Sequence, residues 1–145
     1  MKKLFKNICI ASDHAGFELK EKIKDYLISK NIPVIDLGAY SELSVDYPDF
    51  ARKVTKRLIL KKNDAGILVC GSGTGMAITA NKFKGIRAAQ CYNKNSTILS
   101  RQHNNSNIIC LGSRMLKYKD AIKYVTYFLN TKFKGGRHQK RINKI

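Results

Sequence analysis

The sequence predicts an α/β protein whose parallel sheet is covered by helices on both faces. Short apolar runs alternate along the chain with segments whose apolar residues recur at helical spacing. Glycines and polar residues also follow several of these runs directly, at the edge where an open parallel sheet presents its ligand-binding groups. We therefore expect a three-layer, Rossmann-like α/β/α sandwich with a five-stranded parallel sheet.

The five expected strands are short runs that are rich in isoleucine, valine, leucine and alanine, as buried parallel strands are. Pro33 stands at the start of the second run, where a missing N–H costs least. The expected strands are residues 8–11, 34–37, 65–69, 86–89 and 107–111.

A helical segment follows each strand. In the first, Phe17, Ile23, Tyr26 and Leu27 recur near helical spacing, and Pro48 lies near the start of the second. The expected helices are residues 17–29, 49–60, 74–83, 95–102 and 119–129.

The chain length limits the number of domains, and the tail is too polar to belong to the core. With 145 residues, 43% of them hydrophobic, the chain can fill one core but not two, so we expect a single domain over residues 1–145. Its basic tail, about residues 131–145, is too polar for a core strand. Arg137 and Arg141 are four apart in this tail and would share one helix face.

The charge balance is strongly basic, with 28 Lys and Arg against 10 Asp and Glu and a net charge of +18. Nucleic acid is one partner that this charge suggests. Against that role, the lysines are scattered and no RNA-recognition signature accompanies them. A basic surface would also steer anionic metabolites toward a site.

Targeting and redox signals point to the cytoplasm. No apolar run is long enough for a membrane span, and no secretory signal is visible. Four cysteines lack the paired spacing of a disulfide framework or a zinc site, which favours a reducing compartment.

The first candidate site is the segment Cys70-Gly71-Ser72-Gly73-Thr74-Gly75, which joins an expected strand to an expected helix. Unpaired N–H groups at a helix N-terminus favour phosphate or an oxyanion, and here a thiol lies beside them. The alternative is a tight turn that needs glycine only for backbone freedom. A dinucleotide site is rejected, because the loop follows the third strand and no acidic residue stands about 20 residues further on.

Two further segments contain histidine. Asp13 and His14 follow the first strand, where a carboxylate and an imidazole could order a sugar hydroxyl and move a proton. Asp13 could instead simply cap the next helix, and His103 could simply end one. The histidines, His14, His103 and His138, all lie outside the strands, so we expect them to meet Cys70 at the carboxyl edge of the sheet, with help from a second subunit.

The order of eight motifs resembles the ribose/galactose isomerase family, and within it the ribose-5-phosphate isomerase B type. The resemblance covers nearly the whole chain. The motifs lie at residues 12–17, 46–48, 70–75, 80–82, 85–88, 100–104, 111–114 and 135–138.

This resemblance implies an aldose–ketose isomerase of the non-oxidative pentose phosphate pathway, without metal or cofactor. It would interconvert ribose 5-phosphate and ribulose 5-phosphate through an enediolate. The alternatives are a hexose 6-phosphate substrate, allose or galactose 6-phosphate, and a basic nucleic-acid-binding protein. The resemblance also implies the strand order 2-1-3-5-4. It implies a homodimer or dimer of dimers, in which His103, Asn104 and Arg114 reach the partner's Cys70.

The resemblance further implies a role for each site residue. Cys70 is the base that moves the proton between the reacting carbons, and His103 opens the furanose ring with help from Asp13 and Tyr47. Ser72 stands where many relatives have threonine and keeps the hydroxyl. The backbone of Gly71, Ser72, Gly73, Thr74 and Gly75 holds the enediolate oxygen, and the remaining substrate and phosphate contacts are His14, Asn104, Arg114, Arg137 and Arg141. The chemistry agrees, because preorganised N–H donors stabilise such an oxygen and a helix N-terminus favours a thiolate.

Overall fold

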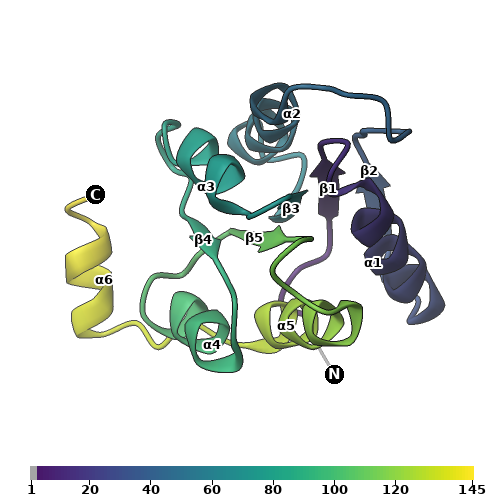
Figure 1. Cartoon of the computed structure of the whole chain (residues 1–145). Coiled ribbons are helices and arrows are strands. Elements are labelled where there is room, and N and C mark those ends of the chain that lie inside the picture. Colours follow the sequence, from purple (N-terminus) through teal and green to yellow (C-terminus); the bar gives the residue numbers. More distant parts are fainter. Residues whose placement is uncertain (1–2) are drawn as a thin grey trace.

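The computed structural model describes residues 3–145 and contains a five-stranded parallel sheet (Figure 1). Neighbouring strands follow the order β2-β1-β3-β5-β4, which confirms both the expected sheet and its implied order. The strands are β1 (Ile8–Ser12), β2 (Val34–Asp36), β3 (Ala65–Cys70), β4 (Ala88–Gln90) and β5 (Ile108–Gly112).

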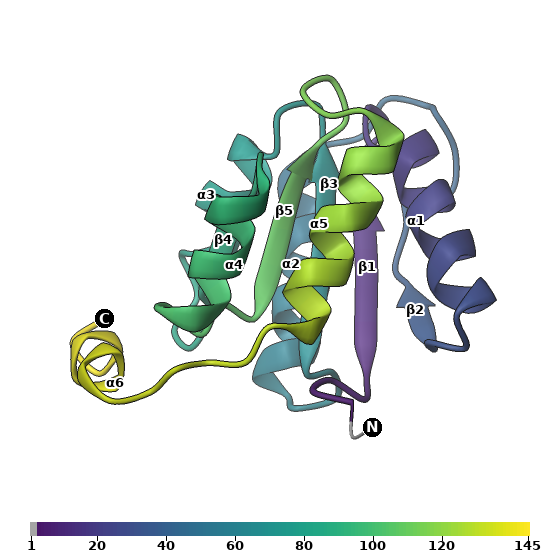
Figure 2. The same cartoon turned by 90° about the horizontal axis from the view of Figure 1, so that it is seen from below.

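Helices cover the two faces of the sheet. One face packs on α1 (Phe17–Ser29) and α5 (Tyr118–Asn130), with α4 (Lys94–Gln102) beside α5. The other face packs on α2 (Tyr47–Ile59) and α3 (Thr74–Ala80). A final short helix, α6 (Arg137–Ile142), stands apart from these layers, near the end of the molecule where the strands begin (Figure 2).

Strand alternation decides which layer each core side chain enters. Ile67 and Val69 of β3 point into the α1–α5 layer, whereas Leu68 and Cys70 point into the α2–α3 layer. All six residues of β3 are buried. Cys70 is therefore the last residue of a central strand, and its side chain faces the layer in which α2 and α3 begin.

The register of the central strands brings three turns together. Ser12 of β1 is opposite Val69, and Cys70 is opposite Gly112 at the end of β5. Gly16 lies so close to the Val69 carbonyl that no side chain would fit there. The turns after β1, β3 and β5 therefore lie side by side at the carboxyl edge.

A buried lysine organises the chain after β2. The Lys20 ammonium is fully buried and donates to both Asp36 carboxylate oxygens, at 2.7 and 2.9 Å, and to the Ala39 carbonyl at 2.6 Å. Burial alone would raise the pKa of Asp36, but the hydrogen bonds from Lys20, the Gly38 N–H and Lys24 lower it.

The segment held by Lys20 supports the turn after β1. The Ser12 N–H donates to the Gly38 carbonyl at 2.7 Å, and the Ala39 N–H donates to the Ser12 carbonyl at 2.8 Å. Ser12 directly precedes Asp13. Two backbone hydrogen bonds thus connect the segment held by the buried ion pair to Ser12, at the carboxyl edge of the sheet.

Several boundaries differ from the expectation. The fourth strand begins at Ala88 rather than Ile86, because the N–H of Ile86 closes a turn onto Phe83 and the N–H of Arg87 donates to the Asn107 side chain. The helix expected over residues 74–83 ends at Ala80. The basic tail forms α6, so the expected helix over Arg137 and Arg141 is confirmed.

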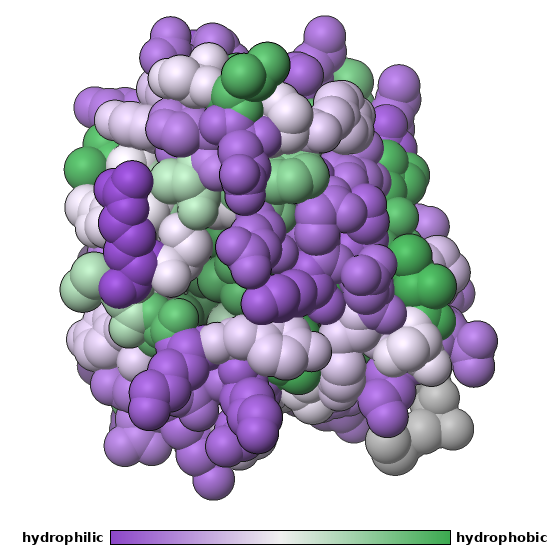
Figure 3. All heavy atoms as spheres, turned by 45° about the vertical axis from the view of Figure 1, so that its right-hand side comes forward, coloured by the Kyte–Doolittle hydropathy of each residue, from purple (hydrophilic) through white to green (hydrophobic). Residues whose placement is uncertain are grey.

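The surface is largely hydrophilic on the face shown in Figure 3, with hydrophobic residues mostly scattered. Within residues 3–145, none of the helices combines the length and the hydropathy that crossing a bilayer requires.

Candidate functional site

Cys70 lies at the end of β3 with its sulphur directed at the glycine loop. Its side chain is almost buried, with 4% of the residue exposed, and its Sγ accepts the Gly73 N–H at 3.1 Å. Gly73 has a φ of +80° and is the residue from which α3 begins. The sulphur therefore lies against the backbone N–H groups of the loop that leads into α3.

The other three cysteines, all within the described chain, are in different surroundings. Burial raises the pKa of Cys9 to about 12 and also raises the pKa of Cys91 and Cys110. The Cys9 and Cys91 thiols donate to backbone carbonyls instead of accepting N–H groups. Only Cys70 thus combines a backbone N–H donor with a position at the carboxyl edge.

Two of the loop glycines are in close contact with predicted site residues. A side chain on Gly75 would lie 2.6 Å from the ring of Tyr47, and one on Gly71 would lie 2.9 Å from the Arg114 guanidinium. Both contacts reflect close approach rather than a positive φ, and at Gly71 the neighbour is the flexible end of the Arg114 side chain. Arg114 thus contacts the glycine loop of its own chain, and the expectation that it reaches a partner's Cys70 stays a prediction.

The loop is further held by polar contacts. The Thr74 N–H donates to the Ser72 hydroxyl at 3.3 Å. The Gln90 amide donates to the Ser72 carbonyl and to the Thr74 hydroxyl, both at 3.0 Å. Gln90 was not predicted as a site residue; it ends β4, so its position next to the glycine loop depends on strand order, which a single sequence does not display.

Asp13 and His14 lie beside this loop, on the turn after β1. Asp13 is 6% exposed, and one of its oxygens accepts the Gly16 N–H at 3.0 Å; it therefore closes the turn before α1, whose N-cap residue Gly16 makes no side-chain cap hydrogen bond, and does not itself cap the helix. His14 Nδ1 lies 3.2 Å from both the nitrogen and the oxygen of Val45. His14 thereby ties the long segment before α2 to the carboxyl edge.

An open hollow of about 540 Å³ lies between these segments. Tyr47 lines it and also touches Gly75, which joins the hollow to the glycine loop. Its lining residues are Asp13, His14, Ser44, Val45, Asp46, Tyr47, Pro48, Asp49 and Arg52. The hollow is thus lined by carboxylates, an imidazole, a phenol and a guanidinium, and its Tyr47 ring connects it to the glycine loop that follows the Cys70 thiol.

The remaining predicted residues lie at the other end of the molecule. His103 follows α4 and precedes β5, whose first residue Ile108 is opposite Gly66. Cys70 is four residues further along β3, which is about 13 Å of strand. One chain alone therefore does not bring His103 to Cys70, since helix α4 returns His103 to the amino edge. The expectation that the histidines meet Cys70 with help from a second subunit stays a prediction.

At the amino edge, His103 is stacked on His138. The two rings lie 4.2 Å apart between centroids, with 12° between their planes, and His138 is 8% exposed. The Lys134 N–H donates to the Gln102 carbonyl at 3.0 Å and fixes the tail against the end of α4. Burial lowers the pKa of His138, and neighbouring positive charges lower it further.

This second group forms its own hollow of about 330 Å³, with two guanidiniums, two imidazoles and an amide in its lining. Such donors suit a phosphate. His138 was expected near the other histidines but was given no role of its own, and its stack on His103 is not visible as a sequence motif. The lining residues are His103, Asn104, Arg137, His138, Arg141, Ile142 and Ile145.

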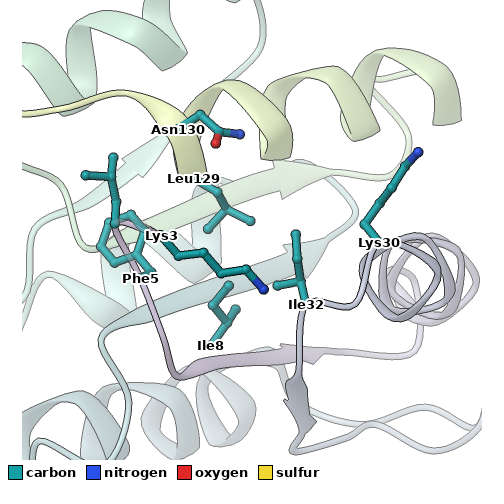
Figure 4. Close-up of a pocket in the computed structure, with 8 residues that line it drawn as sticks. Lys3, Phe5, Ile8, Lys30, Ile32, Leu129 and Asn130 are labelled. Carbon is teal, nitrogen blue, oxygen red and sulfur yellow. The ribbon is translucent and has the colours of Figure 1, made fainter. Parts of the chain in front are cut away.

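A further hollow, of about 250 Å³, also opens at the amino edge but contains none of the predicted residues (Figure 4). Its floor is formed by Ile8, Ile32 and Leu129, and the Lys3 ammonium donates to the Asn31 carbonyl at 3.0 Å. Over residues 3–145, no three His, Cys, Asp or Glu side chains gather as a metal site would require.

Comparison with known proteins places this arrangement in a family. Residues 8–145 match the family model described as Ribose/Galactose Isomerase. The chain is 48% identical over 143 residues to a protein of Mycoplasma genitalium named as a probable ribose-5-phosphate isomerase B, with 96% of this chain and 93% of that protein covered.

Solved structures agree with the sequence comparison. A ribose-5-phosphate isomerase B from Thermotoga maritima superposes with a TM-score of 0.94 at 53% identity, covering 95% of both chains. The Mycoplasma genitalium ribose-5-phosphate isomerase B, solved with bound ribulose-5-phosphate, gives a TM-score of 0.90 at 46% identity, covering 95% of this chain and 92% of that one. With matching residues along nearly its whole length, this chain belongs to the ribose/galactose isomerase family.

Proposed function

We propose that this protein is an aldose–ketose isomerase that interconverts D-ribose 5-phosphate and D-ribulose 5-phosphate through an enediolate. The observation that carries the proposal is the Cys70 sulphur, which accepts a backbone N–H in the glycine loop at the start of α3; the Tyr47 ring packs on this loop and lines an open polar hollow. The relative solved with ribulose-5-phosphate supports the choice of a pentose phosphate. The whole chain would act as one domain, in the cytoplasm.

The reaction starts from the ring form of ribose 5-phosphate. A proton moves from the C1 hydroxyl to the ring oxygen, which gives an aldehyde at C1 and a hydroxyl at C4. We propose that His103 moves this proton. Asp13 and Tyr47 border the hollow and would orient the sugar hydroxyls there.

The second stage moves a proton between two carbons. The Cys70 thiolate removes the C2 proton and leaves an enediolate. The resulting thiol returns a proton to C1 while the C2 hydroxyl proton passes to the oxygen on C1, which leaves the ketone at C2. The negative oxygen of the enediolate would be held by backbone N–H groups of residues 71–75. Such donors contribute about 3–4 kcal/mol each in enzymes where one has been removed.

The two stages need groups that lie at opposite edges of the sheet. We infer that a second copy of the chain supplies the missing half, so that His103, Asn104, Arg137 and Arg141 of one copy face the Cys70 group of the other. The phosphate would lie among Arg137, Arg141 and His14. A homodimer with two shared sites satisfies this requirement, because a two-fold axis pairs each half with its complement.

The test is turnover of ribose 5-phosphate by the purified protein, followed as ribulose 5-phosphate appears. Allose 6-phosphate and galactose 6-phosphate serve as comparison substrates. We expect kcat/KM to be highest for the pentose. A protein that converted only a hexose phosphate would retain the mechanism but contradict the proposed substrate. A protein that converted none, and that bound RNA or DNA with a steep dependence on salt, would favour the nucleic-acid alternative.

A further inference from the structure

The turn that presents His103 and Asn104 is held by two arginines that have no place in the chemistry described so far. It joins α4 to β5 and contains Asn105, whose φ of +45° is in the left-handed region. A non-glycine residue rarely adopts this conformation without support from its surroundings. The support comes from Arg87 and Arg101, whose guanidiniums both reach Asn105.

Arg87 approaches the turn from the segment before β4. Its Nε donates to the Asn104 carbonyl at 3.0 Å and to the Asn105 carbonyl at 3.2 Å, and its Nη2 donates to the Asn105 carbonyl at 3.0 Å. One planar fork therefore binds two successive carbonyls, and the first belongs to a predicted substrate contact. A lysine offers no such fork.

Arg101 binds the same turn from the helix side. Its Nη1 donates to the Asn105 side-chain oxygen at 3.0 Å and to the Ser106 carbonyl at 2.6 Å. Its Nε donates to the Thr131 carbonyl at 3.1 Å, and its guanidinium lies 4.9 Å from the Phe5 ring centre. Arg101 thus belongs to the core as much as to the turn, whereas all three side-chain hydrogen bonds of Arg87 go to the turn.

The backbone of Arg87 strengthens the connection. The Arg87 N–H donates to the Asn107 side-chain oxygen at 2.8 Å, and the Asn107 N–H donates back to the Arg87 carbonyl at 3.0 Å. Arg87, the residue before β4, therefore binds the turn at residues 104–105 through its side chain and at Asn107 through its backbone. Within the part of the chain that the structure describes, His103 itself makes one hydrogen bond, from its N–H to the Leu99 carbonyl, and stacks on His138.

We infer that Arg87 is a positioning residue: its guanidinium fixes the turn so that His103 and Asn104 take the geometry needed to open the sugar ring. Arg87 does this through the two carbonyls and not through the substrate. The inference rests on the proposed function, since ring opening is the step given to His103. It predicts that loss of the Arg87 guanidinium slows ring opening but leaves the rate of proton transfer by Cys70 unchanged.

The two substrates allow the stages to be measured separately. Ribose 5-phosphate is a furanose and must be opened before its C2 proton can leave. Ribulose 5-phosphate has its ketone at C2 and its C5 hydroxyl esterified, so it cannot close a five-membered ring. In D₂O the Cys70 stage alone therefore exchanges a C1 hydrogen of ribulose 5-phosphate for deuterium.

The experiment compares Arg87→Met and Arg87→Lys with the wild type in both assays. For Arg87→Met we expect kcat on ribose 5-phosphate to fall about 10- to 100-fold, since a misplacement of about 1 Å can cost 100-fold. Exchange at C1 of ribulose 5-phosphate should stay within about twofold of the wild type, because Cys70 is untouched. The kcat of Arg87→Lys should lie between those of the wild type and Arg87→Met, since an ammonium can replace one hydrogen bond of the guanidinium but not the whole fork.

The matched control is Lys84→Met, which removes one positive charge from an exposed residue of the same connection. It should leave both assays unchanged. Equal losses of turnover and exchange in Arg87→Met would overturn the inference and indicate general disruption. A raised KM at unchanged kcat would overturn it in favour of direct substrate binding by Arg87.

A second readout needs no activity and so separates this inference from the proposed function. The imidazole proton signals of His103 and His14 can be followed by NMR in the free protein. In Arg87→Met the His103 signals should shift or broaden while those of His14 stay in place. If His103 were unaffected, the inference would fail even for an active enzyme. If the wild type were inactive but His103 responded, only the proposed function would fail.

Discussion

At the carboxyl edge of the sheet, Cys70 and Arg114 lie on turns that leave buried strands, whereas at the amino edge His103 and His138 lie on a helix end and on the tail. Register places the first group, because Cys70 is opposite Gly112 in the ladder. The second group depends on a few individual contacts, such as the ring stack and the hydrogen bond from Lys134 to Gln102. The core therefore secures one half of the candidate site, and a few contacts between the end of α4 and the tail secure the other.

Removing the Cys70 thiol is the substitution for which we expect the largest loss of turnover. In Cys70→Ala we expect turnover to fall by about 10²- to 10⁴-fold, the usual effect of losing a general base. The measurement is kcat on ribose 5-phosphate. Cys110→Ala is the matched control, because Cys110 is a buried cysteine on the same face of the neighbouring strand. It should cost stability but not the reaction; a Cys70→Ala enzyme with normal turnover would exclude Cys70 as the base.

Mixing two inactive variants shows whether the edges belong to one site. Cys70→Ala and His103→Ala should each lose activity. If they are unfolded and refolded together, random pairing makes half of the dimers mixed, and each mixed dimer contains one intact site out of two. Roughly a quarter of wild-type activity should then return. Activity that stayed at the level of the separate variants would contradict a site shared between copies.

Breaking the buried ion pair tests how firmly the core holds the carboxyl edge. Asp36→Asn removes the carboxylate that accepts two hydrogen bonds from the buried Lys20 ammonium and leaves it the Glu21 carboxylate at 3.1 Å; breaking a buried pair typically costs about 3–5 kcal/mol, which is the upper bound here. Denaturant unfolding measures the loss. Asp120→Asn is the control, since its 3.7 Å pair with Lys123 lies at the surface and should contribute about 0–1 kcal/mol. Equal effects of the two substitutions would contradict the role given to Lys20.

The smallest expected effect concerns pH at the amino edge. Because burial and nearby charges lower the pKa of folded His138, the unfolded chain binds a proton more readily below about pH 6.5. His138 therefore lowers the free energy of unfolding as the pH falls from 6.5 toward its folded pKa. The melting temperature of the wild type should fall more steeply between pH 7 and 5.5 than that of His138→Gln. Identical slopes would mean that the stack does not resist protonation.

Much of the fold was predictable from local patterns. Apolar runs and helical spacing located all five strands and their following helices, and the glycine loop identified the Cys70 end. The two edges differ here as well. Residues next to a strand end, such as Asp13, could be placed from sequence alone, because parallel strands share one direction.

The amino edge was not predictable in the same way. Whether His103 meets Cys70 depends on the direction of α4 and on where the tail docks, and neither leaves a local signal. The contacts of Arg87 join residues 17 and 18 positions apart, and the His138 stack joins residues 35 positions apart. A single sequence shows the residues but not these pairings.

Lys20 also gives the molecule an internal reporter of unfolding. Of the lysines in residues 3–145, Lys20 is the one that is fully buried, and most of the others are exposed. An amine-reactive label should therefore modify the surface lysines within minutes yet reach Lys20 only when α1 opens. The rate at which Lys20 is labelled would follow the opening of that helix, as amide exchange does for backbone groups. Peptide mass spectrometry could thus time the loosening of the carboxyl edge in the same sample in which turnover is measured.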